Sequence, residues 1–171
     1  MRRNKLTEQC PFDDESYLQR VVFAQSDGFI AIYNISPITP GHSLIIPRRH
    51  VESLYHLTES ECVDFVTFAR RVTKLLLRVF SSDAFDWTIQ EGEPAGQSIT
   101  HLHLHVIPRI EGDLESPGAW YPKLELQRQL RLERGEIDSA DRPHIRSEDA
   151  TVIVARLRQA ATKAHLFSKF R

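Results

Sequence analysis

His101-Leu102-His103-Leu104-His105-Val106 is the stretch that decides how this sequence is interpreted, because it holds three of the chain's eight histidines. The histidines alternate with apolar residues at period two, which is the spacing of a β-strand. In an extended strand the three histidines lie on one face, while Leu102, Leu104 and Val106 lie on the other. The pattern therefore predicts a strand with one buried face and one face of imidazoles.

Imidazole chemistry makes several functions possible for this face. A histidine can act as a nucleophile, a general base, an anion binder or a metal ligand, and a purely structural role is the weakest interpretation of three in a row. A histidine that attacks phosphorus forms a phosphoramidate that water can later cleave, and flanking donors stabilise the charge on the phosphoryl oxygens. We expect His103, the middle one, to be the nucleophile. His42 is expected to supply a fourth imidazole or, through the preceding carbonyl, a hydrogen-bond acceptor.

A zinc site is the alternative chemical interpretation of the same histidines. Cys10, His50 and His101 are candidate ligands, because zinc binds sulfur and imidazole nitrogen. A Cys-x-x-Cys pair would strengthen this interpretation, but Asp13 stands where the second cysteine would be. We therefore expect no bound metal.

The composition is that of an ordinary globular protein of 171 residues, with 41% hydrophobic and 26% charged residues. Because 22 basic side chains oppose 23 acidic ones, no overall charge recruits nucleic acid or a membrane surface. No apolar run approaches the roughly 20 residues that span a bilayer. Cys10 and Cys62 lie in unlike contexts and are expected to be free thiols, which favours a cytoplasmic location.

The pattern along the chain predicts an α+β fold with a mainly antiparallel sheet. Thr58 and Glu61 have the spacing of a capping box and begin a helix that is expected to end near Phe80. Pro37 to Gly41 is expected to form a rigid loop. Besides the histidine stretch, the predicted strands are Val21 to Gln25, Phe29 to Tyr33, His42 to Ile46 and Asp86 to Gln90.

The C-terminal part is expected to contain two further helices, at Lys123 to Arg134 and from Ser147 to about Phe167, joined by a charged linker. The apolar residues predicted to dock the last helix are Val152, Ala155, Leu157 and Ala160. Trp120 and Tyr121 precede these helices and either stack on a base or form an exposed hinge.

The loop before the histidines has the composition of a phosphate-binding loop. Gly96 allows the backbone to approach a ligand closely, and Gln97 and Ser98 add side-chain hydrogen-bond donors suited to phosphate oxygens. Arg48, Arg49 and Arg109 are either polyphosphate ligands or solvated residues at strand ends.

The sequence resembles the histidine triad (HIT) superfamily of nucleotide hydrolases and transferases, whose signature is His-x-His-x-His with apolar residues between. "NISPITPGHSLIIPRRHVESL", from Asn34, and "IQEGEPAGQSITHLHLHVIPRIEGDL", from Ile89, resemble successive blocks of its fragile-histidine (Fhit) branch. Pro108-Arg109 and Gly112-Asp113 favour this branch over the phosphoramidase branch, where Gly-Gly-Arg is expected.

The resemblance implies a HIT-like fold, with an antiparallel sheet of about five strands and two main helices, paired into a homodimer. It implies an N-terminal arm at 1–20, a HIT domain at 21–110 and a C-terminal helical extension at 111–171. The arm before Val21 has no clear match in the family, and Lys123 to Pro143 is more charged than the family pattern.

The resemblance also assigns roles to individual residues. His103 takes up the nucleotidyl group, His105 contacts the phosphate and assists the leaving group or water, and His101 and His42 order the nucleophile. Tyr121 falls in a flexible segment of the family. The residues that match substrate-binding positions are Asn34 and Gln90 on the nucleoside side and Gly96, Gln97, Ser98 and Ile99 in the phosphate loop.

The expected function is hydrolysis of dinucleoside polyphosphates, such as diadenosine tri- or tetraphosphate, at an α-phosphate through a nucleotidyl-histidine intermediate. An adenosine phosphoramidase or AMP-lysine hydrolase is the alternative enzyme, and a slow-turnover nucleotide-binding signalling protein is an alternative of another class. No tightly bound cofactor is expected, and Mg²⁺ or Mn²⁺ would arrive with the polyphosphate.

Overall fold

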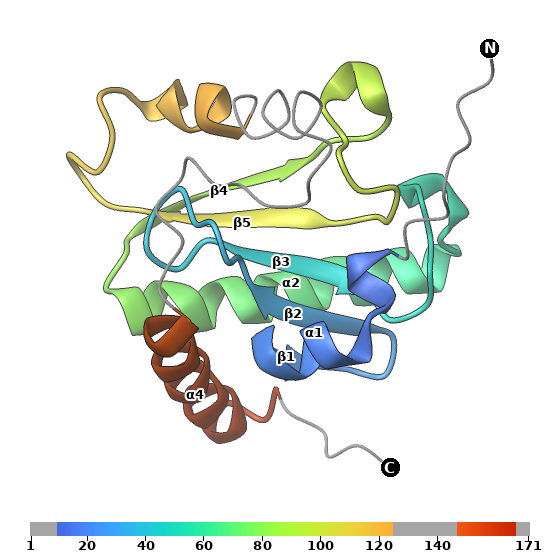
Figure 1. The fold of residues 1–171 in the computed structure, drawn as a ribbon, viewed down its shortest axis with the longest axis horizontal. Helices are drawn as coiled ribbons and strands as arrows, with labels where there is room; N and C mark the ends of the chain where they lie inside the picture. The colour runs from blue at the N-terminus through green and yellow to red at the C-terminus, as the bar shows by residue number, and fades with distance from the viewer. Residues whose placement is uncertain (1–9, 125–146, 167–171) are drawn as a thin grey trace.

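The computed structural model describes residues 10–124 and 147–166. Its centre is one five-stranded sheet in the order β1-β2-β3-β5-β4, in which every neighbouring pair is antiparallel (Figure 1). This confirms the predicted α+β class. The strands are β1 (Val22–Gln25), β2 (Phe29–Tyr33), β3 (Ser43–Pro47), β4 (Ala84–Ile89) and β5 (Leu104–Arg109).

Helices cover both faces of the sheet (Figure 1). One face packs against α2 (Glu59–Phe80) and α4 (Ser147–Lys163) and forms the larger apolar core. The other face packs against the short helices η1 (Pro11–Asp13) and α1 (Glu15–Val21), which form a smaller core with Ile30, Ile32 and Leu44. Residues 11–21 therefore form a folded layer over the sheet.

The histidine stretch keeps its predicted alternation, although the regular strand begins only at Leu104. Leu102, Leu104 and Val106 lie in the core on the α2 side. The three histidines are buried as well, at 0%, 5% and 6% exposure for His101, His103 and His105. Both faces are buried because Phe12 of η1 packs its ring edge against His101 and His103.

The capping box of α2 is present, since the Thr58 hydroxyl accepts from the Glu61 amide and the Glu61 carboxylate accepts from the Thr58 amide. The helix ends at Phe80, as predicted.

The docking face of α4 is only partly the predicted one. Leu157 is buried and Ala160 packs against the core, as predicted. Val152 is 69% exposed and Ala155 is exposed, whereas Val154 and Ala161 are buried instead. Apolar residues at 152–155 fit two adjacent helical faces, and contact with β1 and α2 selects one of them.

The predicted polar helix at Lys123 to Arg134 lies mostly outside the described residues, although 120–124 are helical. The charged linker that follows it also lies outside them. No helix in the described segments is long and apolar enough to cross a bilayer.

Candidate active site

The loop from Pro37 to Gly41 carries His42 into the sheet next to the histidine stretch. The Thr39 hydroxyl donates to the Pro108 carbonyl oxygen at 2.8 Å, which ties the loop to β5. Gly41 has φ +92°, and a Cβ there would lie 2.7 Å from the Phe80 ring at the end of α2. Only glycine fits this close approach and this φ. His42 is consequently held fully buried between β3 and β5.

The tautomer of His42 follows from a backbone hydrogen bond. The amide of Ile38 can only donate, and it lies 3.2 Å from Nδ1 of His42, so this nitrogen carries the lone pair. Nε2 of His42 then carries the hydrogen and donates to Nδ1 of His105 at 3.0 Å. In neutral His105 the hydrogen must therefore lie on Nε2. The loop thus sets His105 as a donor through its Nε2.

The tautomer of His103 follows from a carbonyl group. Nδ1 of His103 lies 2.7 Å from the carbonyl oxygen of His101, which can only accept a hydrogen bond. Nδ1 carries the hydrogen and Nε2 carries the lone pair, which is the form a nucleophile needs. The rings of His103 and His105 have centroids 5.0 Å apart. The pair therefore combines a nucleophilic nitrogen with a neighbouring hydrogen-bond donor.

His101 is directed away from this pair toward the N-terminal arm. Its Nε2 donates to the Pro47 carbonyl oxygen at 3.1 Å. Burial lowers the pKa of His101, which favours the neutral ring with a lone pair on Nδ1. This Nδ1 lies 3.5 Å from a carboxylate oxygen of Asp13 and 3.6 Å from the Cys10 sulfur. The backbone carbonyl of His101 therefore fixes the tautomer of His103, whereas the ring of His101 faces a second cluster of polar residues.

The second cluster, Cys10, Asp13, His50 and His101, has the donor set of a metal site. One ligand atom from each residue lies within 4.8 Å of all the others. The Asp13 carboxylate also accepts from Nδ1 of His50 at 2.7 Å. The lone pair of His101 faces the other Asp13 oxygen, and two acceptors at this distance are stabilised by a cation between them. Sulfur, imidazole and carboxylate ligands suit Zn²⁺, and the Pro47 contact orients His101 as a ligand.

Asp13 makes contacts that its sequence context did not indicate. It counted against zinc because it replaces a cysteine, yet the structure places its carboxylate between the two imidazoles. Phe12 was missed altogether, although its ring covers His101 and His103. Pro11 at the start of η1 was the available signal for local structure in the arm.

The residues predicted to bind the nucleoside, Asn34 and Gln90, each follow the last residue of a strand. The side-chain nitrogen of Asn34 lies 3.4 Å from Nε2 of His42. The side-chain oxygen of Asn34 accepts a hydrogen bond from the Ser36 amide. Gln90 follows β4 and is 9% exposed. Within the described residues its side chain makes no hydrogen bond, so this buried amide has capacity for a ligand.

The predicted phosphate loop is strongly ordered. Gly96 adopts φ +94° after the short helix η3 (Glu93–Ala95). The side chain of Gln97 accepts from the Gly92 amide and donates to the Glu52 carbonyl oxygen, so it braces the loop. Ser98 is exposed, whereas Ile99 packs on the small core beside Phe12. The ligand roles of these residues remain predictions.

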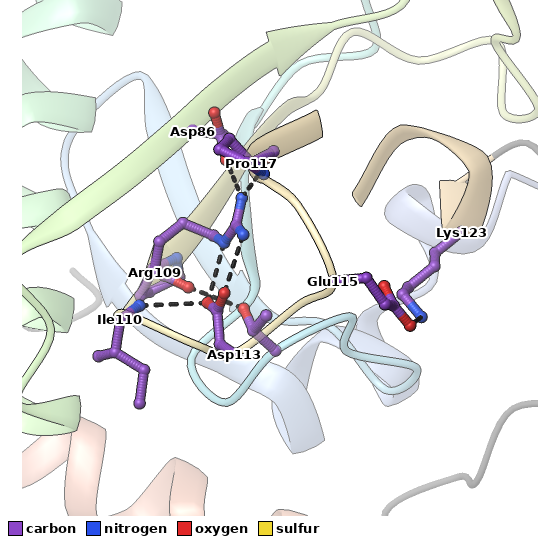
Figure 2. A network of polar contacts seen from close by, with 9 residues as sticks. Asp86, Arg109, Ile110, Asp113, Glu115, Pro117 and Lys123 are labelled. Carbon is purple, nitrogen blue, oxygen red and sulfur yellow. Dashed lines mark hydrogen bonds and ion pairs between the residues drawn. The ribbon is translucent and has the colours of Figure 1, made fainter. Parts of the chain in front are cut away.

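Two of the three arginines considered as polyphosphate ligands are held by carboxylates. Figure 2 shows Arg109 in a two-pronged pair with Asp113, with its third nitrogen donating to Asp86 and to the Pro117 carbonyl oxygen. Arg49 pairs with Glu61 at 2.9 Å. Arg48 donates to Gln25 at 3.2 Å. Arg109 therefore anchors the segment 110–117, which leads to Trp120 and Tyr121.

Comparison with known proteins shows the family of this fold. The model of the HIT domain family matches residues 16–112. The chain belongs to the HIT family. The match includes the histidine stretch, His42 and the loop between them, which is the part of the chain that builds the site.

Two relatives of this HIT protein are named for polyphosphate hydrolysis. It is 41% identical over 104 residues to an asymmetrical bis(5'-nucleosyl)-tetraphosphatase of Schizosaccharomyces pombe, covering 61% of this chain and 57% of that protein. It is 34% identical over 113 residues to a bis(5'-adenosyl)-triphosphatase of Dictyostelium discoideum, covering 66% and 76%. The chain thus spans little more than half of the first relative. Both relatives support the Fhit-like branch of the family.

A solved structure shares the fold over almost the whole chain. A hypothetical histidine triad nucleotide-binding protein of Sulfolobus tokodaii superposes with a TM-score of 0.67 at 22% identity, covering 90% of this chain and 93% of that one. At this identity the likeness shows the fold alone.

Proposed function

We propose that this HIT protein hydrolyses dinucleoside polyphosphates by attack of His103 on an α-phosphorus. Nε2 of His103 forms the phosphorus–nitrogen bond, and the bond from that phosphorus to the bridging oxygen breaks. The departing polyphosphate is ADP from diadenosine triphosphate and ATP from the tetraphosphate. Water then cleaves the phosphorus–nitrogen bond and releases AMP. The names of the two relatives support this substrate class.

The observation that carries the proposal is the tautomer of His103. The His101 carbonyl holds the hydrogen on Nδ1, so Nε2 is ready to attack without prior loss of a proton. The relay from Ile38 through His42 gives His105 a hydrogen on Nε2, which can be donated to a phosphoryl oxygen. Both arrangements are made by groups of the protein itself, so they need no reorganisation during the reaction.

Replacement of the nucleophile tests the proposal directly. In His103→Asn the covalent step cannot occur, so turnover of diadenosine triphosphate should disappear while the Kd for the substrate changes little. His56→Asn is the matched control, because His56 is an exposed histidine whose hydrogen bonds to described residues are made by its backbone. Substantial turnover by His103→Asn would remove this residue from the nucleophile role.

A substrate panel separates the alternatives that share the intermediate. Faster hydrolysis of an AMP amide than of diadenosine tri- or tetraphosphate would favour a phosphoramidase or AMP-lysine hydrolase. Tight binding with very slow turnover of all of them would favour a nucleotide-binding signalling protein. The same panel, assayed with Mg²⁺, with Mn²⁺ and with chelator, tests our proposal that a divalent cation arrives with the polyphosphate and neutralises its charge.

We also propose that Cys10, Asp13, His50 and His101 hold a structural zinc ion. The facing acceptors of Asp13 and His101 are the supporting observation. The ion would attach the N-terminal arm to the histidine stretch, and no step of the reaction is assigned to it. Elemental analysis of protein purified without added zinc is expected to give about one zinc per chain, and much less for Asp13→Asn. Equal, negligible zinc in both would refute the site.

A homodimer through the edge strand β4 is the assembly we propose. β4 is a terminal strand of the sheet, and Phe85 on it is 46% exposed. On α2, Val63 and Val66 are also more than half exposed. An open edge with exposed apolar residues favours pairing with a second copy. Light scattering should give about twice the 19.7 kDa of one chain, and Phe85→Lys should lower it. We propose a cytoplasmic location, which is supported by the finding that Cys10 and Cys62 form no disulfide.

A further inference from the structure

A cleft of about 370 Å³ lies between α2 and the C-terminal end of α4, away from the histidines. It belongs to the α2 side of the sheet, whereas His101 and His103 face Phe12 on the opposite side. Four of its seven lining residues are cationic, and we call the set the basic cleft. It consists of Arg70, Arg71, Lys74, Leu75, Arg78, Ala164 and Leu166.

The positive charge of the basic cleft is not balanced by the part of the protein that the structure describes. There, Arg70, Lys74 and Arg78 are exposed and make no hydrogen bond or ion pair. Arg71 donates to the carbonyl oxygen of His165 at 3.1 Å, which is a neutral partner. This differs from Arg109 and Arg49, which pair with carboxylates. The chain as a whole has a net charge of −1, so the cleft is a local concentration of charge.

This concentration of positive charge destabilises α2. Arg70 and Lys74, and Lys74 and Arg78, are four residues apart on one helix, where like charges repel. The negative end of the helix dipole offsets this repulsion in the last turn, at Arg78, but not at Arg70, more than two turns from Phe80. Arg70, Lys74 and Arg78 form a row of cations along α2, and a bound anion would relieve the repulsion among all three.

The length of the row indicates the kind of anion. Eight residues separate Arg70 from Arg78, which is a rise of about 12 Å along the helix. A row of this length matches a chain of linked phosphates better than a single phosphate. The floor of the cleft is aliphatic, formed by Leu75, Ala164 and Leu166, so the lining offers no aromatic ring on which a base could stack.

We propose that the basic cleft is a second ligand site that binds the phosphate chain of a polyphosphorylated small molecule independently of any base. The ligand is either an inorganic polyphosphate or a nucleoside triphosphate bound by its phosphates. The site does not depend on the proposed hydrolysis, because it lies on the other side of the sheet.

Nuclear magnetic resonance of the full chain locates the binding. Backbone amides at 70–78 and 164–166 should shift saturably with sodium tripolyphosphate and with ATP, with affinities within about threefold of each other, and not with adenosine. The binding should weaken as ionic strength rises. A response to ATP alone would refute independence from the base. Shifts confined to the histidine stretch would refute the second site while leaving the proposed hydrolase intact.

Charge neutralisation tests the cations individually. Each Gln substitution should weaken tripolyphosphate binding at these amides by about threefold, as for an exposed ion pair, so Arg70→Gln, Lys74→Gln and Arg78→Gln together should weaken it by about thirtyfold. Glutamine retains helix propensity. The matched pair is Arg78→Gln and Arg20→Gln, since both remove an exposed cation from the last turn of a helix. Equal effects of Arg78→Gln and Arg20→Gln on tripolyphosphate affinity, or an unchanged affinity in the triple variant, would overturn the proposal. If the triple variant does not fold, the affinities of the single variants decide.

Discussion

A methyl group at Gly41 tests how the fold positions the histidines that we propose to be catalytic. Gly41 precedes His42 and has φ +92°, a backbone conformation that L-residues rarely adopt. Its Cβ would lie 2.7 Å from Cδ2 of Phe80 and 2.9 Å from Cγ of Pro108, both closer than van der Waals contact. Gly41→Ala therefore adds backbone strain and a clash with two packed rings.

The two costs can be estimated separately. Left-handed backbone costs a non-glycine residue about 1–2 kcal/mol, and an extra methyl group in a packed interior costs about 1–3 kcal/mol. Gly41→Ala should therefore lower the free energy of unfolding by about 2–5 kcal/mol, a large part of the stability of a domain of this size. Displacement of the loop would also lengthen the contact between His42 and His105, so turnover should fall in the folded fraction.

Two other glycines provide the controls. Gly112 has φ +77° with no atom of the described structure within 4 Å of its Cβ position, so Gly112→Ala isolates the backbone strain. Gly28 has equally open space and no positive φ, so Gly28→Ala should be near neutral. Equilibrium denaturation in urea measures all three variants. A loss of unfolding free energy in Gly41→Ala no larger than that in Gly112→Ala would contradict the clash with Phe80 and Pro108.

The remaining predictions concern the stability of the protein in acid, the packing of Phe12 over the histidines and the hydrogen bond from His42 to His105. The hydrogen bonds from Arg109 lower the pKa of Asp113 below its ordinary 3.8, so the stability that its carboxylate contributes is present above that pH and is lost as the pH falls through the lowered pKa. Asp113→Asn should flatten the acid limb of stability against pH, and Asp83→Asn, at an exposed aspartate, should not. Phe12→Ala should cost about 3–5 kcal/mol in urea denaturation because the ring is 4% exposed, and a cost under about 1 kcal/mol would contradict its packing. His42→Ala should lower kcat by at least about tenfold with little change in KM, and ¹⁵N shifts of His105 should show a changed tautomer.

Much of the fold could be predicted because it rests on short-range patterns. Period-two alternation assigns the histidines and leucines to opposite faces, and the Thr58–Glu61 spacing marks the start of α2. These features depend on backbone geometry within a few residues, so the sequence contains them directly. The nucleophilic candidate and the antiparallel sheet follow from the same patterns, and the resemblance to the HIT family strengthened both.

By itself, then, the sequence determined the strands, the main helix and the row of imidazoles. Only the tertiary structure decided which partners these groups meet. Cys10 and Asp13 reach His101 across about 90 positions of chain, and Arg109 is enclosed by Asp86 and Asp113 rather than open to phosphate. The lone pair on His103 likewise depends on the observed contact with the His101 carbonyl. Periodicity states which way a side chain points, whereas the identity of its neighbours depends on how distant segments pack.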